Sequence, residues 1–191
     1  MLDKEEVIIK IAVIAGTTRV QRKSFEAAKL IAEIGKTLDN VEITLIDPMD
    51  FKFPGDGDDP EAKDPRYSKI TLESDAFFIV TPEYNHSFPG SLKRMLDSEL
   101  KNYIHKPVAL AGASSGNWGG VRAVESLVNA VREMGLVATY TDVYFPHVGD
   151  SFVDGVLRPE LVERTHKSIH AAYGELLWMA KALKQAREAK G

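Results

Sequence analysis

The sequence predicts an α/β fold in which helices cover both faces of a five-stranded parallel sheet. Apolar, β-branched runs alternate with segments whose apolar residues recur at helical spacing, and five such pairs follow one another along the chain. Strands that alternate with helices require parallel pairing through right-handed crossovers. The length of 191 residues suits one domain, so we expect a single domain over residues 1–191.

The first two strands are expected at Val7 to Ala15 and at Val41 to Ile46. The earlier run, VIIKIAVIA, is almost entirely apolar, which is typical of a strand buried on both faces. Between the two strands, a helix reaching about Leu38 is predicted by apolar residues at helical spacing: Phe25, Ala28, Leu30, Ile31 and Ile34.

A surface excursion is predicted over residues 48–66, where four prolines and two glycines stand among many acids. A short helix is then expected from Tyr67 to Glu73, and the third strand from Ala76 to Thr81. The next helix should begin near Ser87 as its N-cap, with Pro89 in the first turn.

The remaining elements complete a doubly wound sheet. We expect the fourth strand at 107–113, a helix over 121–134 closed by Gly135, the fifth strand at 136–145 and a final helix over about 160–190. Five strands in one domain fit the three-layer, flavodoxin-like order 2-1-3-4-5 better than a six-stranded dinucleotide fold. Ligands of such sheets bind at the carboxyl ends of the strands.

The composition excludes several classes of function. The chain has no cysteine, which rules out disulfides, thiolate metal sites and a cysteine nucleophile. Its 24 basic and 28 acidic residues give a net charge of −4, so no overall field favours nucleic acid. The acidic first residues resemble no signal peptide, and no apolar run approaches the ~18 residues of a membrane helix. We therefore expect a cytoplasmic protein without a membrane partner.

The first polar loop, residues 16–24 (GTTRVQRKS), is a candidate anion site. It lacks both G-x-G-x-x-G and the G-K-[ST] of a P-loop. At a helix N-terminus, three hydroxyls and three cations suit a phosphate monoester: Thr17, Thr18, Ser24, Arg19, Arg22 and Lys23. In the alternative, Ser24 only caps the helix and the cations are solvated. Three cations at a helix start oppose its dipole, which weakens that alternative.

Two further loops follow the third and fourth strands. In TPEYNHSFPG two prolines restrict the backbone and Tyr84 offers a stacking surface, although a plain turn is the alternative. In SSGNWGG three glycines allow a ligand to approach the backbone closely. Trp118 would cover a ligand, pack against a second subunit or lie in the core. Strands one, three and four are neighbours in the predicted order, so all three loops should meet at one edge.

Three segments resemble the NADPH-dependent FMN reductase family of flavodoxin-like proteins: GTTRVQRKSF, TPEYNHSFPGSLKRMLD and ASSGNWGGVRAVESLVNAVREMG. The family includes azoreductase-like, chromate-reducing and quinone-reducing enzymes. The resemblance spans roughly residues 8–145, and PEYN is its most specific part. It implies that hydride from NAD(P)H reduces bound FMN, which passes electrons to a flavin, quinone or similar small acceptor.

The resemblance also implies positions for the cofactor. Thr17, Arg19 and Ser24 fall on phosphate-binding positions with Arg22 as a helper, Pro82, Glu83, Tyr84 and Asn85 line the isoalloxazine ring, and Ser114, Ser115 and Gly116 contact its pyrimidine side. Many relatives place an asparagine just after Ser24, where this chain has Glu26.

No catalytic acid or base is expected, because a flavin supplies the redox chemistry. His86 and His147 are candidates for contacts with the acceptor or with NAD(P)H phosphates, or are partly exposed loop histidines. A metal site is disfavoured, since only His166 and His170 have i, i+4 spacing and no H-E-x-x-H pattern surrounds them. The alternatives are an FMN-binding electron carrier or redox sensor, and a site for another phosphorylated ligand.

The resemblance further implies a homodimer or homotetramer. In the helix after PEYN, four charged residues would pair across a two-fold axis or form a solvated face: Lys93, Arg94, Asp97 and Glu99.

Overall fold

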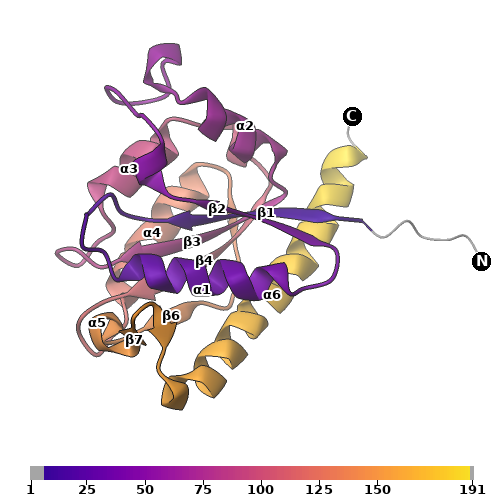
Figure 1. The fold of residues 1–191 in the computed structure, drawn as a ribbon. Helices are drawn as coiled ribbons and strands as arrows, with labels where there is room; N and C mark the ends of the chain where they lie inside the picture. The colour runs from indigo at the N-terminus through magenta and orange to yellow at the C-terminus, as the bar shows by residue number, and fades with distance from the viewer. Residues whose placement is uncertain (1–6, 190–191) are drawn as a thin grey trace, which may run out of the picture.

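The computed structural model describes residues 7–189, so the N-terminal segment examined for a signal peptide and the predicted helix end at Lys190 lie outside it. One parallel sheet organises the chain in the order β2-β1-β3-β4-β5, with β6 also beside β4 (Figure 1). The predicted α/β class and the order 2-1-3-4-5 are confirmed. The strands are β1 (Ile9–Ala15), β2 (Val41–Ile46), β3 (Ala76–Pro82), β4 (Pro107–Ala113), β5 (Val137–Ala138) and β6 (Val143–Phe145).

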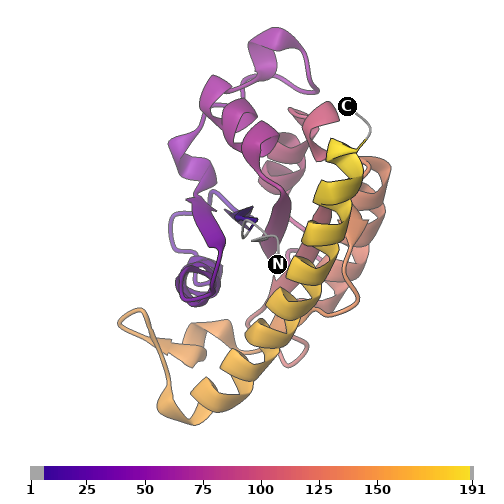
Figure 2. The same cartoon turned by 90° about the vertical axis from the view of Figure 1, so that its right-hand side faces the viewer.

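Helices cover both faces of the sheet. One face carries α1 (Ser24–Lys36) and α6 (Pro159–Glu188), and the other carries α2 (Pro65–Glu73), α3 (Gly90–Asp97) and α4 (Val121–Glu133). Figure 2 shows α6 running the length of the molecule, with a small hairpin beside its first turns. That hairpin is β7 (Phe152–Val153) and β8 (Val156–Leu157), and it follows the short helix α5 (Val148–Ser151). Short 3-10 turns occur at Pro48–Asp50, Pro60–Ala62 and Lys101–Tyr103.

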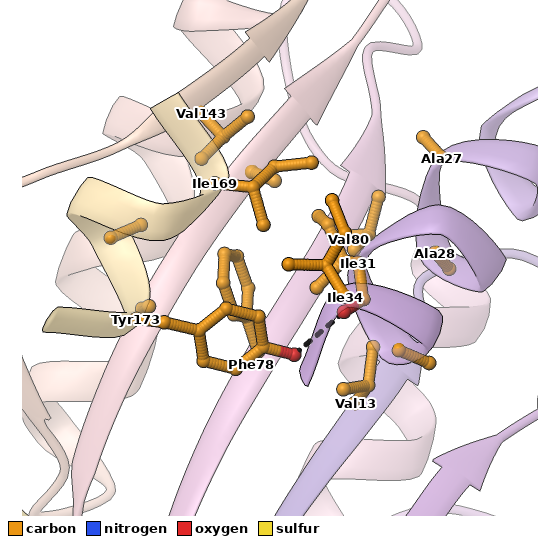
Figure 3. Packing of buried hydrophobic residues seen from close by; sticks show 14 of the residues in the cluster. Val13, Ala27, Ala28, Ile31, Ile34, Phe78, Val80, Val143, Ile169 and Tyr173 are labelled. Carbon is orange, nitrogen blue, oxygen red and sulfur yellow. Dashed lines mark hydrogen bonds between the residues drawn. The ribbon is translucent and has the colours of Figure 1, made fainter. Parts of the chain in front are cut away.

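Two apolar clusters hold the layers together. Successive strand residues point to opposite faces, so Phe78 and Val80 join α1 and α6, whereas Phe77 and Ile79 join the other three helices. In the first cluster the hydroxyl of Tyr173 donates to the carbonyl of Ile31 at 2.8 Å (Figure 3). This bond satisfies a buried phenol where α6 crosses α1.

Two predicted elements differ from the structure. The fifth strand is interrupted between β5 and β6, where Tyr140 is 92% exposed and the polar chain leaves the sheet edge. Helix α3 begins at Gly90 rather than near Ser87, and Pro89 is its N-cap. Ser87 instead pairs with Tyr84 in a tight turn, and its hydroxyl bonds the hydroxyl of Ser126 at 2.9 Å, so it cannot cap the helix.

The carboxyl ends of β1, β3, β4 and β6 lie at one edge of the sheet, where the loops at 16–23, 83–89, 114–120 and 146–147 leave it. This edge therefore positions the candidate site. From residue 7 to residue 189, no helix combines the length and the apolar character needed to cross a bilayer.

Candidate functional site

A cavity of about 230 Å³ opens where three loops converge. Eight of the twelve cofactor-binding candidates line it: Arg19, Arg22, Ser24, Pro82, Glu83, Tyr84, Ser114 and Ser115. The other four lie outside the lining: Thr17, Thr18, Asn85 and Gly116. The structure thus brings together residues from all three loops that the sequence singled out.

The first loop leaves β1 tightly packed against β3. The amide of Gly16 donates to the carbonyl of Val80 at 2.8 Å. A Cβ at Gly16 would lie only 2.8 Å from that same oxygen and 3.1 Å from the Cα of Thr81. Only glycine fits this approach, so Gly16 fixes where the loop starts.

Thr17 links the first loop to the second. It is 2% exposed, and its hydroxyl lies in a hydrogen bond 3.2 Å from the phenol oxygen of Tyr84. The same hydroxyl accepts the amide of Arg19 at 3.2 Å. Thr17 therefore holds Tyr84 from behind the cavity lining rather than facing the cavity.

The three cations of the first loop have different environments. Arg22 forms an ion pair with Asp47 at the end of β2, donates to the carbonyl of Thr17 at 3.0 Å and lies 4.5 Å from the ring centre of Phe25. Arg19 and Lys23 make no side-chain hydrogen bond or ion pair within residues 7–189, and both line the cavity. Arg22 thus shapes the loop, while Arg19 and Lys23 leave the cavity electropositive.

Ser24 lies at the positive end of α1. It is the first residue of the helix and is buried in the cavity wall. Lys23 is the N-cap and makes no side-chain capping bond, and the amide of Glu26 donates to the carbonyl of Lys23 at 3.1 Å, so the amides of Ser24 and Phe25 are the first-turn donors that remain for an anion.

The second loop contains a two-residue turn. The backbones of Tyr84 and Ser87 exchange hydrogen bonds of 2.8 and 3.0 Å. Asn85 and His86 between them have φ values of 50° and 65°. Both central residues of a type I′ turn need positive φ, which is uncommon for any residue except glycine, although asparagine and histidine adopt it more often than most. His86 is exposed and lies outside the cavity lining.

Glu83 presents a carboxylate oxygen without a partner. Its amide donates to the carbonyl of Ala113 at 3.0 Å, and its Oε1 pairs with Arg122 at 3.0 Å. The side chain is 10% exposed, and its Oε2 is buried without a hydrogen-bond donor within the described residues. A buried carboxylate oxygen costs free energy unless a donor reaches it, so the geometry favours a ligand O–H or N–H.

The third loop folds tightly against the strand ends. Gly119 and Gly120 have φ values of 61° and 92°, and a Cβ at Gly120 would lie 2.6 Å from the amide nitrogen of Ala113. Trp118 is 66% exposed, which rules out the core position considered above.

Sequence reasoning missed a fourth segment. Val148 and Gly149 of α5 line the cavity, and the amide of Val148 donates to the carbonyl of Ser114 at 2.9 Å. Gln21, Lys23 and Ala113 also line it. The sequence could have predicted the segment at Val148 and Gly149. A parallel strand beside β4 ends at the same edge of the sheet, so the loop after that strand must lie there too.

The family model of the NADPH-dependent FMN reductases matches residues 9–150. The chain belongs to this family. It is 31% identical over 124 residues to an NADPH azoreductase of Bacillus sp. strain OY1-2, an alignment covering 62% of this chain and 66% of that relative. It is 28% identical over 180 residues to an NAD(P)H-dependent FMN reductase of Schizosaccharomyces pombe, covering 87% of this chain and 88% of that relative.

Solved structures show the same fold. The flavoenzyme NAD(P)H:(acceptor) oxidoreductase of Paracoccus denitrificans superposes with a TM-score of 0.73 at 24% identity, covering 91% of this chain and 98% of that one. An archaeal flavodoxin superposes with a TM-score of 0.57 at 16% identity, covering 92% and 99%. This member of the family therefore has a flavodoxin-like fold.

Glu26 stands at the position just after Ser24 where the family resemblance led us to expect an asparagine. Its carboxylate lies 2.6 Å from the amine of Lys29 and beside Gly155 of the β7–β8 turn. Glu26 does not line the cavity. Glu26 thus lies beside the β7–β8 hairpin, beyond the end of the family match, and not in the cavity wall.

The charges of α3 have partners within their own chain. Lys93 pairs with Asp97 along the helix, and Glu99 bonds Ser68 and the amide of Asn102. Arg94 donates to backbone carbonyls of the 48–66 excursion, at Pro54, Gly55, Gly57 and Ala62. These contacts remove the charge pattern as a reason to expect pairing across a two-fold axis. The assembly state itself stays a prediction.

The candidate histidines lie outside the cavity. His147 is exposed and left-handed, with φ of 48°, just before α5. His166 is half-buried and His170 exposed on α6. In the part of the chain that the structure describes, no three His, Cys, Asp or Glu side chains group as metal ligands would.

Proposed function

We propose that this chain is an FMN-dependent NAD(P)H oxidoreductase that reduces quinones, flavins or similar small acceptors. One observation carries the proposal: in a member of the NADPH-dependent FMN reductase family, the three loops meet around one cavity. Relatives named NADPH azoreductase, quinone reductase and NAD(P)H-dependent FMN reductase support the activity.

The chemistry of the cavity fits FMN. Arg19, Lys23 and the first-turn amides of α1 suit a phosphate monoester with about two negative charges. At the other side, the bare Oε2 of Glu83 suits a hydroxyl or ring N–H. The cavity of about 230 Å³ is below the usual ~300–1,000 Å³ of ligand sites, so a flavin would keep part of its ring outside. That open part leaves room for a second reactant to stack.

FMN, when bound, supplies the redox chemistry: it accepts hydride from NAD(P)H and passes electrons to the acceptor. The chain binds and orients the FMN. We assign the phosphate to Thr18, Arg19 and Ser24, with Thr17 and Arg22 fixing the loop. We assign the edge of the isoalloxazine ring to Pro82, Glu83, Tyr84 and Asn85. We assign its pyrimidine side to Ser114, Ser115 and Gly116. Thr17 holds the Tyr84 phenol, which favours a fixed stacking surface beside the reacting face.

An anaerobic visible spectrum tests the proposal. Purified protein loaded with FMN should show flavin absorbance that bleaches on addition of NADPH and returns with a quinone. Flavin that stays bound but is not reduced by NADPH or NADH would indicate an electron carrier or redox sensor instead. A protein that does not bind added FMN would point to another phosphorylated ligand. Size-exclusion chromatography of the same sample tests the expected homodimer or homotetramer.

A further inference from the structure

A second cavity of about 280 Å³ lies on the other side of α5. Most of its lining follows the family match, which ends at residue 150, or stands at its last residues. The wall combines apolar and aromatic side chains with charged ones, chiefly Tyr144, Phe145, Leu157, Leu161, Arg158 and Arg164. The cavity therefore lies at and beyond the end of the segment that the family model matches.

Positive charge exceeds negative charge in this lining. Arg158 and Arg164 stand against a single carboxylate, that of Asp150. Arg164 makes no side-chain hydrogen bond or ion pair within residues 7–189. Arg158 is held in place, because its Nε donates to the carbonyl of Asp150 at 2.5 Å, and Glu160 lies 3.8 Å from its Nη1. One fixed and one uncommitted guanidinium suit a phosphate, which both can bind through paired N–H donors.

The apolar part of the lining suits a flat apolar group. Phe145, Leu157 and Leu161 contribute apolar surface, and Phe145 and Leu157 are buried in the core below. The phenol of Tyr144 donates to Asp142 at 2.9 Å, outside the lining, so Tyr144 contributes its ring to the cavity. An aromatic heterocycle that carries a phosphate matches both parts of the lining.

The two cavities share α5 as a wall. Val148 and Gly149 line the first cavity, and Asp150 and Ser151 line the second. The amide of His147 donates to the carbonyl of Gly116 at 3.2 Å, which ties this wall to the third loop. Four helical residues rise by only about 6 Å, so the second cavity adjoins the first across a single turn of helix.

We propose that the second cavity holds the phosphorylated adenosine end of NADPH, and that Arg158 and Arg164 give the enzyme its preference for NADPH over NADH. NADH lacks the 2′-phosphate that the two guanidinium groups would bind. The inference rests on the proposed reductase function, since it places the reductant of that same reaction. It adds Arg164 as a specificity-determining residue.

Binding of a cofactor fragment tests the site without turnover. Calorimetric titration of the FMN-loaded protein with 2′,5′-ADP should give a dissociation constant at least about tenfold lower than titration with 5′-AMP. Arg164→Gln should abolish most of that difference. Lys181→Gln removes the same charge about 25 Å further along α6 and should leave it unchanged. Equal affinities in the wild type, or an unaltered difference in Arg164→Gln, would overturn the proposal.

Steady-state kinetics separate this inference from the reductase proposal. In Arg164→Gln the KM for NADPH should rise about tenfold, whereas kcat and the KM for NADH stay unchanged. Activity with NADH shows that the FMN site still works. A variant that loses NADH and NADPH turnover equally would refute the specificity role. Competition by an aromatic acid against the quinone, but not against NADPH, would assign the cavity to the acceptor instead.

Discussion

At the amino edge of the sheet the carboxylate of Asp75 is fully paired, whereas at the carboxyl edge several charged groups have no partner within the described residues. Asp75 accepts the amide of Lys10 at 3.0 Å, the amine of Lys184 at 2.8 Å and the guanidinium of Arg187 at 3.3 Å. At the other edge, Arg19 lines the cavity without a side-chain partner in the described chain, and the Oε2 of Glu83 is buried without a donor.

This difference distinguishes charged groups that stabilise the fold from charged groups that are available to bind a ligand. Buried polar groups in folded proteins are normally paired, so each unpaired one calls for an explanation. The pairing at Asp75 ties β3 to the last turns of α6, far from either cavity. Arg19 and Glu83 instead line one cavity. The comparison therefore predicts that mutations at the two edges change different measured quantities.

Removing Asp75 should have the largest effect on stability. Asp75→Ala leaves Lys184 and Arg187 without their shared carboxylate, and loss of one partner of a buried ion pair costs about 3 kcal/mol or more. Urea unfolding followed by circular dichroism measures the change. Asp75→Asn keeps an acceptor and the shape, so it should lose less and remain folded. A loss below about 1 kcal/mol in both variants would contradict the structural role.

At the carboxyl edge, Arg19→Ala should weaken FMN binding without destabilising the protein. Loss of a charge-assisted phosphate contact costs about 1–3 kcal/mol of binding free energy. Fluorescence titration of FMN measures the affinity, and urea unfolding without FMN should match the wild type. Arg132→Ala, an exposed cation on α4, is the control and should change neither quantity. Unchanged FMN affinity in Arg19→Ala would count against the phosphate assignment.

Lys106 is a buried amine at the amino edge, and the pH dependence of stability should show what its burial costs in free energy of unfolding. Its amine donates to the carbonyls of Thr71 and Leu72 at 2.8 and 2.9 Å, near the end of α2. Burial lowers the pKa of Lys106 from 10.5 to about 8, with the charge of Arg187 adding to that and Asp75 opposing it. In the unfolded chain the amine keeps its proton up to about pH 10.5. Between the two values the unfolded state binds more protons, so stability rises with pH.

The rise should amount to about 1.5 kcal/mol between pH 8 and pH 9.5. It should be absent from Lys106→Met, which has no group that titrates there. Measurements should stop near pH 10, because burial also raises the pKa of three tyrosines: Tyr67, Tyr103 and Tyr173. Above that pH these tyrosines lose protons in the unfolded chain but not in the folded one, so the free energy of unfolding falls. Parallel stability curves for wild type and Lys106→Met over this interval would disprove the assigned cause.

The sequence predicted the sheet order and the three loops because both follow from local patterns. Apolar runs and helical spacing set the elements, and the strand order then brings the loop ends together. It did not predict which loop cations have partners, because the pairing of Arg22 with Asp47 joins two separate strand ends. Val148 and Gly149 were missed although the expected fifth strand ends at Phe145, where β6 ends, because the sequence after it showed no motif that marked a site. Contacts between distant residues leave no local pattern to detect.

The turn at Asn85-His86 was likewise invisible in composition, although it sets the geometry of the second loop. Its φ values of 50° and 65° place a histidine where type I′ turns favour glycine. His86→Gly should therefore stabilise the protein by about 0.5–1 kcal/mol, the smallest effect considered, because it relieves left-handed strain. The greater freedom of glycine in the unfolded chain offsets part of this gain.

Kinetics decide whether this strained histidine also serves the reaction. His86 is exposed beside Tyr84 and lies outside the cavity lining. If it only completes the turn, His86→Gly should raise the urea midpoint and leave the KM for quinone unchanged. If it contacts the acceptor, the KM for quinone should rise while FMN affinity stays the same. His147→Gly, a second left-handed histidine just before α5, is the matched control for relief of strain. A lower urea midpoint in His86→Gly would show that contacts of the His86 side chain stabilise the fold by more than its left-handed backbone destabilises it. His86 would then have a structural role, as Asp75 has.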